Sequence, residues 1–393
     1  MAKLFRINKI IFIISFFTSS YYCQENKKFS DFISINGYIK DMKVLSFTSL
    51  DSMLSDNLIH NRINFKAYIN DNITTVLGIR NRVFYGEVTG YNSYLANILD
   101  NDNGAVDLSF ILIDKKNIVF HSILDRAYVK YSANKYEFTI GRQRINWGMN
   151  LAWTPNDIFN AYSLLDFDYQ ERAGVDAFKF KYFTKQMSSI EIAASFTENI
   201  DSNIIAGIYK FNKWRYDFQI LSGNYYNDIA IGFGLDGNIK NAGFKGEFTY
   251  FHPKRNFADT NGNISTSISY DYSFKNGIYF NTSYLYNSSG ANTSLSNNSP
   301  LQTIFGDISA KNIMPSKHSY FMQLSGALNP KLSISFTGIY MHRINLLLAI
   351  PSLSYSISDS WDFTLISQSM IGKTANNING IGTGVFIRFM YSY

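Results

Sequence analysis

The chain has 393 residues, of which 17% are aromatic and only 17% are charged, whereas a soluble domain carries roughly 25% charged residues. Beyond residue 24 no apolar run reaches the length of about 20 residues that a membrane helix needs, so the composition excludes both an ordinary cytosolic enzyme and a helical membrane protein. The single cysteine excludes a disulfide framework or a CxxC redox site. A single hydrophobic core stops growing at about 250–300 residues, whereas a closed β-barrel can be large without a thick core.

Residues 1–23 have the order of a secretory signal peptide, with three basic residues before the apolar stretch 10–17 and small polar residues after it. The apolar stretch is too short to span a bilayer, so we expect export. Lipid modification of Cys23 is a weaker alternative, because Ser20, Tyr21 and Tyr22 are not the small and aliphatic residues expected before a lipidated cysteine. Without the three basic residues of this leader, 33 Lys and Arg face 30 Asp and Glu. This near balance predicts no nucleic-acid partner.

From residue 32 onward the dominant period is two, which is the period of a β-strand with one apolar face. In 59–70, for example, Ile63 and Phe65 alternate with Arg62 and Asn64. We expect eighteen strands, with sixteen as an alternative count. The eighteen segments lie near residues 32–44, 59–70, 73–85, 120–131, 136–146, 175–183, 189–197, 203–210, 213–222, 228–236, 242–251, 263–273, 278–287, 318–328, 331–341, 346–357, 361–370 and 380–393.

The connections between these segments alternate in length. Even-numbered connections are short, as at 71–72, whereas odd-numbered ones include the long excursions 86–119, 147–174, 252–262 and 288–317. Tight periplasmic turns, long outer loops and an even strand count are typical of bacterial outer-membrane barrels. The pattern therefore predicts an all-β fold, a transmembrane antiparallel β-barrel formed by residues 24–393.

Alternation alone would also suit a soluble β-sandwich, but segments of about 9–11 residues match a tilted membrane strand. Lipid cannot satisfy backbone N–H and C=O groups, so a spanning sheet must close on itself. Aromatic residues gather near the strand ends, as in the girdles of membrane barrels: Tyr68, Tyr131, Tyr136, Trp214, Tyr250, Tyr284 and Trp361. The last segment, Val385–Tyr393, resembles the terminal signal that the barrel-assembly machinery recognises. We therefore expect outer-membrane lipid and that machinery as partners.

The most distinctive sequence follows the fifth predicted strand. Gly141–Gly148 reads Gly-Arg-Gln-Arg-Ile-Asn-Trp-Gly and precedes Pro155–Asp157. These residues resemble a motif of Gram-negative porin-like barrels, including alginate-export-type channels, in which a strand ending in a Gly-Arg and Trp-Gly pattern precedes a Pro-x-Asp loop. The resemblance implies an outer-membrane channel. It does not imply alginate as the solute, because no run of arginines extends around the whole predicted lumen.

Charged residues at lumen-facing positions are the candidate pore-lining groups, because a Lys or Arg on the lipid face would cost roughly 2–4 kcal/mol at the membrane midplane. Arg142 and Arg144 share the parity of the lipid-facing Phe138 and Ile140, so the strand either leaves the lipid band at Gly141, which we favour, or changes face at a bulge. The candidates are Arg62, Lys66, Arg80, Arg82, Arg126, Lys130, Arg142, Arg144, Asp157, Asp166, Asp168, Glu171 and Arg172.

Two interpretations of the connection 147–174 remain open. It folds inward and sets its carboxylates opposite the basic wall, so that charge and diameter select solutes; alternatively, its acids pair with Arg172 or Arg144 and only hold the loop against the wall. Trp147, Trp153 and Phe159 suggest loop packing rather than a track for stacking sugars.

Signals for catalysis are poor. Gly232–Gly237 formally matches GxGxxG, but it falls on a period-two strand with no following helix, so we interpret it as small lumen-facing residues. The five histidines lie on separate segments without metal-ligand spacing, and we expect no enzyme activity, metal or cofactor. A short helix is expected at 91–100, and a hairpin of 106–113 with 118–124.

The sequence therefore predicts a monomeric or trimeric channel for passive diffusion of small hydrophilic solutes, with a mild anion preference. The alternative is a surface barrel without a channel function, such as an adhesin or an export-system component, that binds a partner through its outer loops.

Overall fold

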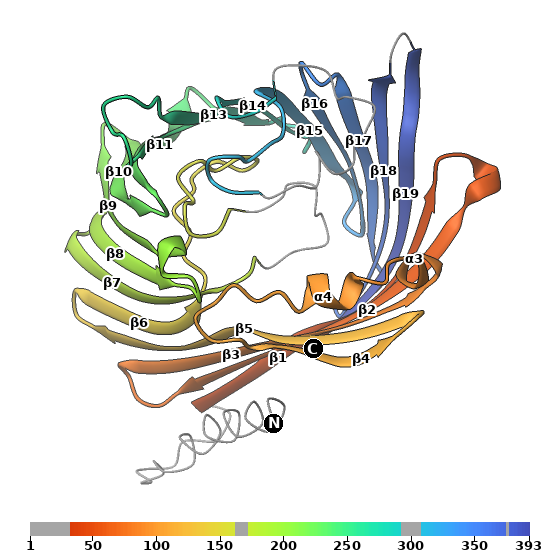
Figure 1. Ribbon diagram of the computed structural model, residues 1–393, viewed down its shortest axis with the longest axis horizontal. Helices are drawn as coiled ribbons and strands as arrows, with labels where there is room; N and C mark the ends of the chain where they lie inside the picture. Colours follow the sequence, from red (N-terminus) through yellow and green to blue (C-terminus); the bar gives the residue numbers. More distant parts are fainter. Residues whose placement is uncertain (1–31, 162–171, 292–307, 375–376) are drawn as a thin grey trace.

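The computed structural model describes residues 32–161, 172–291, 308–374 and 377–393, and these form a closed antiparallel barrel (Figure 1). Each strand of the ring pairs with its sequence neighbours in the ring, and the first pairs with the last, with Ile39 opposite Tyr391. The ring strands are β1 (Ile33–Phe47), β2 (Leu54–Tyr68), β3 (Ile73–Gly86), β5 (Ile118–Ala133), β6 (Tyr136–Gln143), β7 (Val175–Lys185), β8 (Ser188–Phe196), β9 (Ile204–Lys213), β10 (Tyr216–Tyr225), β11 (Asp228–Ile239), β12 (Ala242–Pro253), β13 (Asn263–Ser273), β14 (Tyr279–Asn287), β15 (His318–Asn329), β16 (Leu332–Met341), β17 (Leu346–Ser356), β18 (Trp361–Thr374) and β19 (Asn377–Ser392).

These eighteen strands confirm the predicted fold and strand count, and every predicted segment coincides with one of them. The predicted leader, residues 1–23, lies outside the described residues. One short turn differs from the prediction: β9 and β10 meet at Trp214 and Arg215 rather than at residue 212. Both residues have positive φ (56° and 66°), as the two-residue turns that suit the twist of a hairpin require.

A nineteenth strand, β4 (Ser109–Lys115), lies in the connection between β3 and β5. It pairs with residues 118–123 of β5, whereas β6 pairs with residues 127–133 of the same strand. β4 therefore continues the sheet beyond the end of β6 without adding a strand to the ring. The predicted hairpin is confirmed by β4 and β5, and the predicted helix by α4 (Leu95–Leu99), which follows α3 (Glu87–Tyr91).

The two faces of the ring differ as the period of two requires. On β11, Ile229, Ile231 and Phe233 are 37%, 52% and 40% exposed on the outer face, whereas Ala230 is fully buried on the inner face. An apolar exterior around a sheet with no free edge is what hydrocarbon requires. None of the helices in the described ranges is long and apolar enough to cross a membrane.

The long connections 87–117, 144–174 and 288–317 all begin and end at the same edge of the ring, as does 254–262. Because periplasmic turns of such barrels are short, we take this edge as the outer one. The first residues of β1 and the last residues of β19 then lie at the opposite, periplasmic edge.

Candidate pore and its inward loop

Residues 144–161, which we call the inward loop, lie inside the ring of strands (Figure 1). Trp147, Trp153 and Ile158 are at most 2% exposed. Burial of this kind requires that the loop contacts the inner wall closely rather than hanging free in the lumen. The contacts that follow show which part of the wall it uses.

Glu247 on β12 holds the loop through three backbone groups. One of its carboxylate oxygens accepts hydrogen bonds from the N–H groups of Met149 at 2.5 Å and Asn150 at 2.6 Å, and the other accepts from Asn156 at 2.9 Å. Glu247 itself is 2% exposed, so these hydrogen bonds form away from water. A single side chain of the wall thus fixes both halves of the loop.

Asn156 forms a second anchor. Its amide nitrogen donates to the carbonyl oxygen of Phe233 at 3.0 Å, and its amide oxygen accepts from the hydroxyl of Thr249 at 2.7 Å. The loop can come this close because β11 carries glycine here: a Cβ at Gly232 or Gly234 would lie 2.8 Å or 2.9 Å from the Asn156 amide. The prediction of small inward-facing glycines is confirmed for Gly232 and Gly234, and the structure supplies their purpose, whereas Gly237 has the parity of the outward-facing Ile231 and Phe233 and lies against Tyr216.

The aromatic side chains of the loop are packing residues, as predicted. The Trp147 indole N–H donates to Glu191 at 2.6 Å, and its ring meets Phe159 edge-on with centroids 4.9 Å apart. Trp153 packs in the same way against Phe321 of β15, at 6.1 Å. Neither indole presents a face to the lumen, because Trp147 and Trp153 are 0% and 1% exposed.

Asp157 is fully buried and therefore does not line an open constriction. Its carboxylate accepts hydrogen bonds from the Trp147 N–H at 3.3 Å and from Arg172 Nη1 at 2.9 Å. Burial raises the pKa of Asp157 to about 6, although Arg172, the Trp147 N–H and Arg144 all act to lower it. The arrangement favours the structural alternative, in which the acid pairs with an arginine. The other predicted acids, Asp166, Asp168 and Glu171, lie outside the described residues.

The opposite part of the wall carries the basic side chains, and a bulge in β5 arranges them. Gly78 of β3 pairs with Arg126, but Ile79 pairs with Leu124, so Asp125 is an extra residue. A bulge re-aims side chains, and here Asp125 and Arg126 both turn inward, at 2% and 9% exposure. Asp125 was not predicted. Its only signal in the sequence is that the alternation of apolar and polar residues is broken at Leu124, Asp125 and Arg126.

Asp125 is the centre of an ion-pair cluster. Arg62 donates to its two carboxylate oxygens at 2.6 Å and 3.0 Å. Arg126 lies with Nη1 3.9 Å from the Asp125 carboxylate and donates to the carbonyl oxygens of Asp125 and Arg172. The basic wall and the end of the connection 144–174 are thereby joined.

Arg142 forms a second cluster one strand further on. It donates to Asp176 at 2.7 Å and 2.8 Å, and to Asp102 at 2.6 Å, and is 3% exposed. The β5–β6 pairing runs through Gly141 without a register shift, which excludes a bulge there. Instead Gly141 has φ 115°, and a Cβ would lie 2.2 Å from the carbonyl oxygen of Ala127. Only glycine permits this turn, just before β6 ends, and it sends Arg142 inward.

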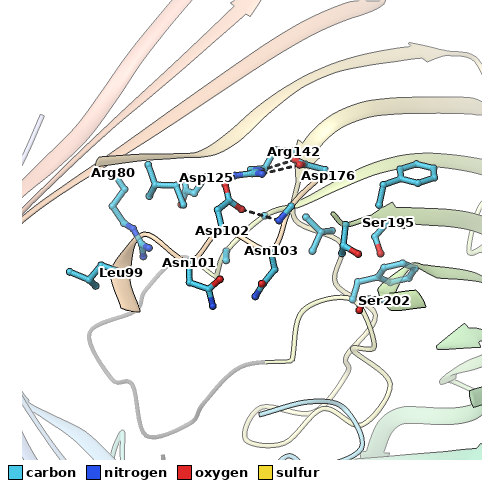
Figure 2. Close-up of a pocket in the computed structure, with 18 of the residues that line it drawn as sticks. Arg80, Leu99, Asn101, Asp102, Asn103, Asp125, Arg142, Asp176, Ser195 and Ser202 are labelled. Carbon is cyan, nitrogen blue, oxygen red and sulfur yellow. Dashed lines mark hydrogen bonds and ion pairs between the residues drawn. The ribbon is translucent and has the colours of Figure 1, made fainter. Parts of the chain in front are cut away.

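Both clusters border a cavity of about 460 Å³ at the outer end of the lumen, which we call the mouth pocket (Figure 2). It lies between the connection 87–117, including α4, and the ends of β5–β9. Arg82 approaches His121, with Nη2 3.0 Å from Nδ1, and Ser109 bonds the other nitrogen of the ring at 2.8 Å. The polar side chains of the lining include Arg80, Arg82, Asn101, Asp102, Asn103, His121, Asp125, Arg142, Asp176, Ser195 and Ser202.

The remaining predicted residues lie elsewhere. Lys66 and Lys130 lie near the periplasmic ends of β2 and β5. Lys66 Nζ is 4.5 Å from the ring centroid of Tyr68, and Lys130 forms an ion pair with Glu137 at 2.8 Å. Arg144 lies beside Asp157. In the described ranges no group of three or more His, Cys, Asp or Glu is placed to hold a metal ion.

No protein-family model matches the chain, and no curated protein matches it in sequence. Solved structures match it in fold. A BenF-like porin from Pseudomonas fluorescens Pf-5 gives a TM-score of 0.56 at 9% identity, covering 92% of this chain and 99% of that one. OccAB4 of Acinetobacter baumannii gives 0.55 at 12% identity, covering 92% and 98%. OccK11 (OpdR) of Pseudomonas aeruginosa gives 0.54 at 10% identity, covering 95% and 100%. The chain therefore has the fold of these solved structures.

Proposed function

We propose that the protein is an outer-membrane channel for passive diffusion of small hydrophilic solutes, with a mild anion preference. An eighteen-stranded ring is wide enough for an aqueous lumen, whereas eight strands would be filled by side chains. The likeness in fold to a porin from Pseudomonas fluorescens supports the same function. The inward loop, residues 144–161, narrows this lumen (Figure 1).

The observation that carries the proposal is the division of the lumen between two walls. The inward loop is fastened to β8 and to β10–β13, whereas the arginines lie on β2, β3, β5 and β6. The mouth pocket lies between the two sides and is lined by both, by Arg80 and Arg82 on one side and by Phe159 and Ser195 on the other. Among the described residues, the arginine side holds five arginines (62, 80, 82, 126 and 142) and three aspartates (102, 125 and 176), a surplus of two positive charges in this group. A small surplus near a constriction biases ions without excluding the opposite sign.

Reversal potentials in planar bilayers under a salt gradient test the anion preference. We expect mild anion selectivity that weakens as salt rises, since the Debye length falls from about 10 Å at 0.1 M to about 3 Å at 1 M. Cation selectivity of the purified channel contradicts the charge assignment, and absence of conductance contradicts the channel itself.

A non-channel surface barrel is the second candidate, and one observation favours it. The connection 87–117 exposes large side chains at the outer edge: Tyr91, Tyr94 and Ile98 are 80%, 70% and 63% exposed. Such a patch suits a protein partner. Liposome swelling with sugars of graded size separates the two candidates, because only a channel gives swelling that falls with sugar size.

The remaining expectations belong to the same proposal. In the segment Val385–Tyr393, residues 385–392 are the last part of β19 and close the ring against β1, and Tyr393 follows with backbone hydrogen bonds to Gly37. This position suits a signal for the barrel-assembly machinery. The alginate-export-type resemblance of Gly141–Gly148 stays a prediction, to which the structure adds only that Gly141, Arg142 and Trp147 have structural roles. Monomer and homotrimer are both compatible with a barrel that closes within one chain.

A further inference from the structure

The outer face of β14, β15 and β16, three adjacent strands of the ring (Figure 1), carries two rows of rings near the outer edge. In the first row Tyr284, Tyr320 and Tyr340 lie opposite one another, with ring centroids 5.3 Å and 6.4 Å apart. The second row lies one step further out and contains Tyr286, His318 and His342, with centroids 5.4 Å and 6.3 Å apart. We call these six residues the outer aromatic belt.

The belt faces away from the lumen. Its inward-facing neighbours Leu285, Ser319 and Ile339 are fully buried, whereas Tyr320 and Tyr340 are 47% and 37% exposed. The rings are also held in place: the Tyr284 hydroxyl and His318 Nδ1 are hydrogen-bonded at 2.8 Å. The belt is therefore a fixed surface that a molecule in the outer half of the membrane would meet.

Two basic residues stand above the belt. Lys317 directly precedes β15, and its Nζ lies 5.8 Å from the ring centroid of Tyr286. Arg343 is exposed in the turn between β16 and β17. Both lie close enough to His318 to act on it electrostatically. The belt is thus capped by positive charge at its outer rim.

This charge is not balanced along the chain. The outer connections of this sector, 288–317 and 342–345, contain Lys311, Lys317 and Arg343 and one acidic residue, Asp307, which lies outside the described residues. Lys311 pairs with Asp228 at 2.6 Å, which leaves Lys317 and Arg343 beside the belt. Other outer connections carry acids close to their bases or carry acids alone: 254–262 holds Asp259 beside Lys254 and Arg255, and 197–203 holds Glu198 and Asp201. The sector β14–β17 is therefore the part of the outer rim suited to an anion.

Below the belt the same face is apolar, with Met322, Leu324 and Phe336 40%, 39% and 41% exposed. From the membrane centre outward, the surface offers apolar side chains, then tyrosines, then imidazoles, then Lys317 and Arg343. The same order runs through a membrane lipid: acyl chains, a polar backbone and an anionic head group. Aromatic rings sit at the head-group level, and each basic side chain near a membrane surface strengthens attraction to anionic lipid.

We propose that the outer aromatic belt, together with Lys317 and Arg343, is a binding site for a phosphorylated glycolipid of the outer leaflet. The two basic side chains hold its phosphate groups, and the rings of the belt pack against its sugar units. The chemistry of the occupant follows from charge complementarity and from the place of the belt at the outer edge. The site is on the opposite face of the wall from the lumen, so it is independent of solute passage.

The test measures lipid bound to the folded, full-length barrel by native mass spectrometry in a mild detergent. The probes are hexa-acylated lipid A with two phosphates, the same lipid without phosphates, and phosphatidylglycerol. Each lost cation should weaken lipid A binding about fivefold, so K317Q/R343Q should raise its Kd roughly 25-fold. The matched control K254Q/R255Q removes two bases from another outer connection and should leave the Kd unchanged.

Removing the phosphates from the lipid should weaken its binding to the wild type to the same degree, and should make no difference to K317Q/R343Q. This arm uses the unaltered protein, so it decides the proposal even when the double variant does not fold. Equal binding of the two forms of lipid A, or binding of phosphatidylglycerol as tight as that of lipid A, overturns the proposal. If K317Q/R343Q changes the number of chains per particle but leaves lipid binding unchanged, the proposal is also overturned, because the belt is then a contact between copies of the chain.

Discussion

The two walls of the lumen differ in chemistry, and the difference explains where the inward loop lies. The wall at β13 is lined by hydroxyl groups, with Ser265, Ser267 and Ser269 at most 1% exposed; the wall at β2 and β3 carries Arg62 and Arg80. Covering hydroxyl groups with a loop is inexpensive when the loop supplies hydrogen bonds. The loop packs on this side, where Glu191 and Glu247 also accept hydrogen bonds from its N–H groups, whereas Arg80 and Arg82 on the other side line the mouth pocket.

The largest expected effect comes from removing the anchor of the inward loop. Glu247→Ala deletes the acceptor of three loop N–H groups, and each buried donor left without a partner costs about 1–3 kcal/mol. The inward loop should leave the wall, which should change single-channel conductance by about twofold or more and make residues 144–161 accessible to protease.

The matched control is Asp236→Asn, which removes a carboxylate of β11 that pairs with Lys245 away from the loop. It should leave conductance and proteolysis unchanged. A loop that stays protected in Glu247→Ala would show that the carboxylate is not what fastens it.

A somewhat smaller effect of the same kind is expected from Gly234→Val. Its added carbons meet the Asn156 amide and Gln219, and overpacking of this kind costs roughly 1–3 kcal/mol. Protease sensitivity of 144–161 should rise, but by less than in Glu247→Ala. Gly246→Val on the neighbouring strand serves as the control, because a Cβ there meets only Leu235, at 3.9 Å. Equal sensitivity of the two glycine variants would remove the idea that β11 makes room for the loop.

On the charged side, we expect Arg80→Gln combined with Arg82→Gln to remove the surplus of two positive charges. The reversal potential in a salt gradient should move toward cation selectivity, most clearly at low salt. Adding Arg126→Gln should extend the shift. Lys130→Gln, at the periplasmic end of the same wall, should leave selectivity nearly unchanged. If none of the four substitutions changes the selectivity, the basic-wall assignment is contradicted.

The smallest expected effect is a pH dependence of the docked loop. Because the pKa of Asp157 is about 6 when buried and 3.8 as an ordinary value, the docked state binds more protons than the released state between these values. Docking is thus strongest at low pH and weakens as pH rises through about 6. From pH 5 to pH 7 the loss is about 1 kcal/mol.

Protease cleavage of 144–161 should therefore be about fivefold faster at pH 7 than at pH 5, measured with a protease active at both. Asp157→Asn should reduce the difference. A cleavage rate that falls as pH rises would contradict the sign of this linkage.

The sequence predicted the ring because strands and short turns are local features. Alternation of neighbouring side chains reports the faces of each strand, and its limits fall within a few residues of the structure. The bulge at Asp125 could not be found in this way, since an extra residue is defined only by the strand it pairs with. Glu247 likewise gave no signal, because its partners Met149 and Asn156 lie more than ninety residues away along the chain. Gly232 and Gly234 of β11 were predicted to face inward, but the reason why glycine is needed there, the close approach of Asn156, appears only in the structure.

The sharing of β5 between β4 and the ring has a consequence for solutes arriving from outside. Residues 118–123 pair with β3 on one side and β4 on the other, so β4 is hydrogen-bonded directly to a strand of the ring. It extends the wall beside His121 and Ile123, which line the mouth pocket, and α4 contacts the same strand β5. Solutes that diffuse toward the mouth pocket therefore meet a taller wall on that flank, and approach is favoured from the side where the described part of the chain has no such extension.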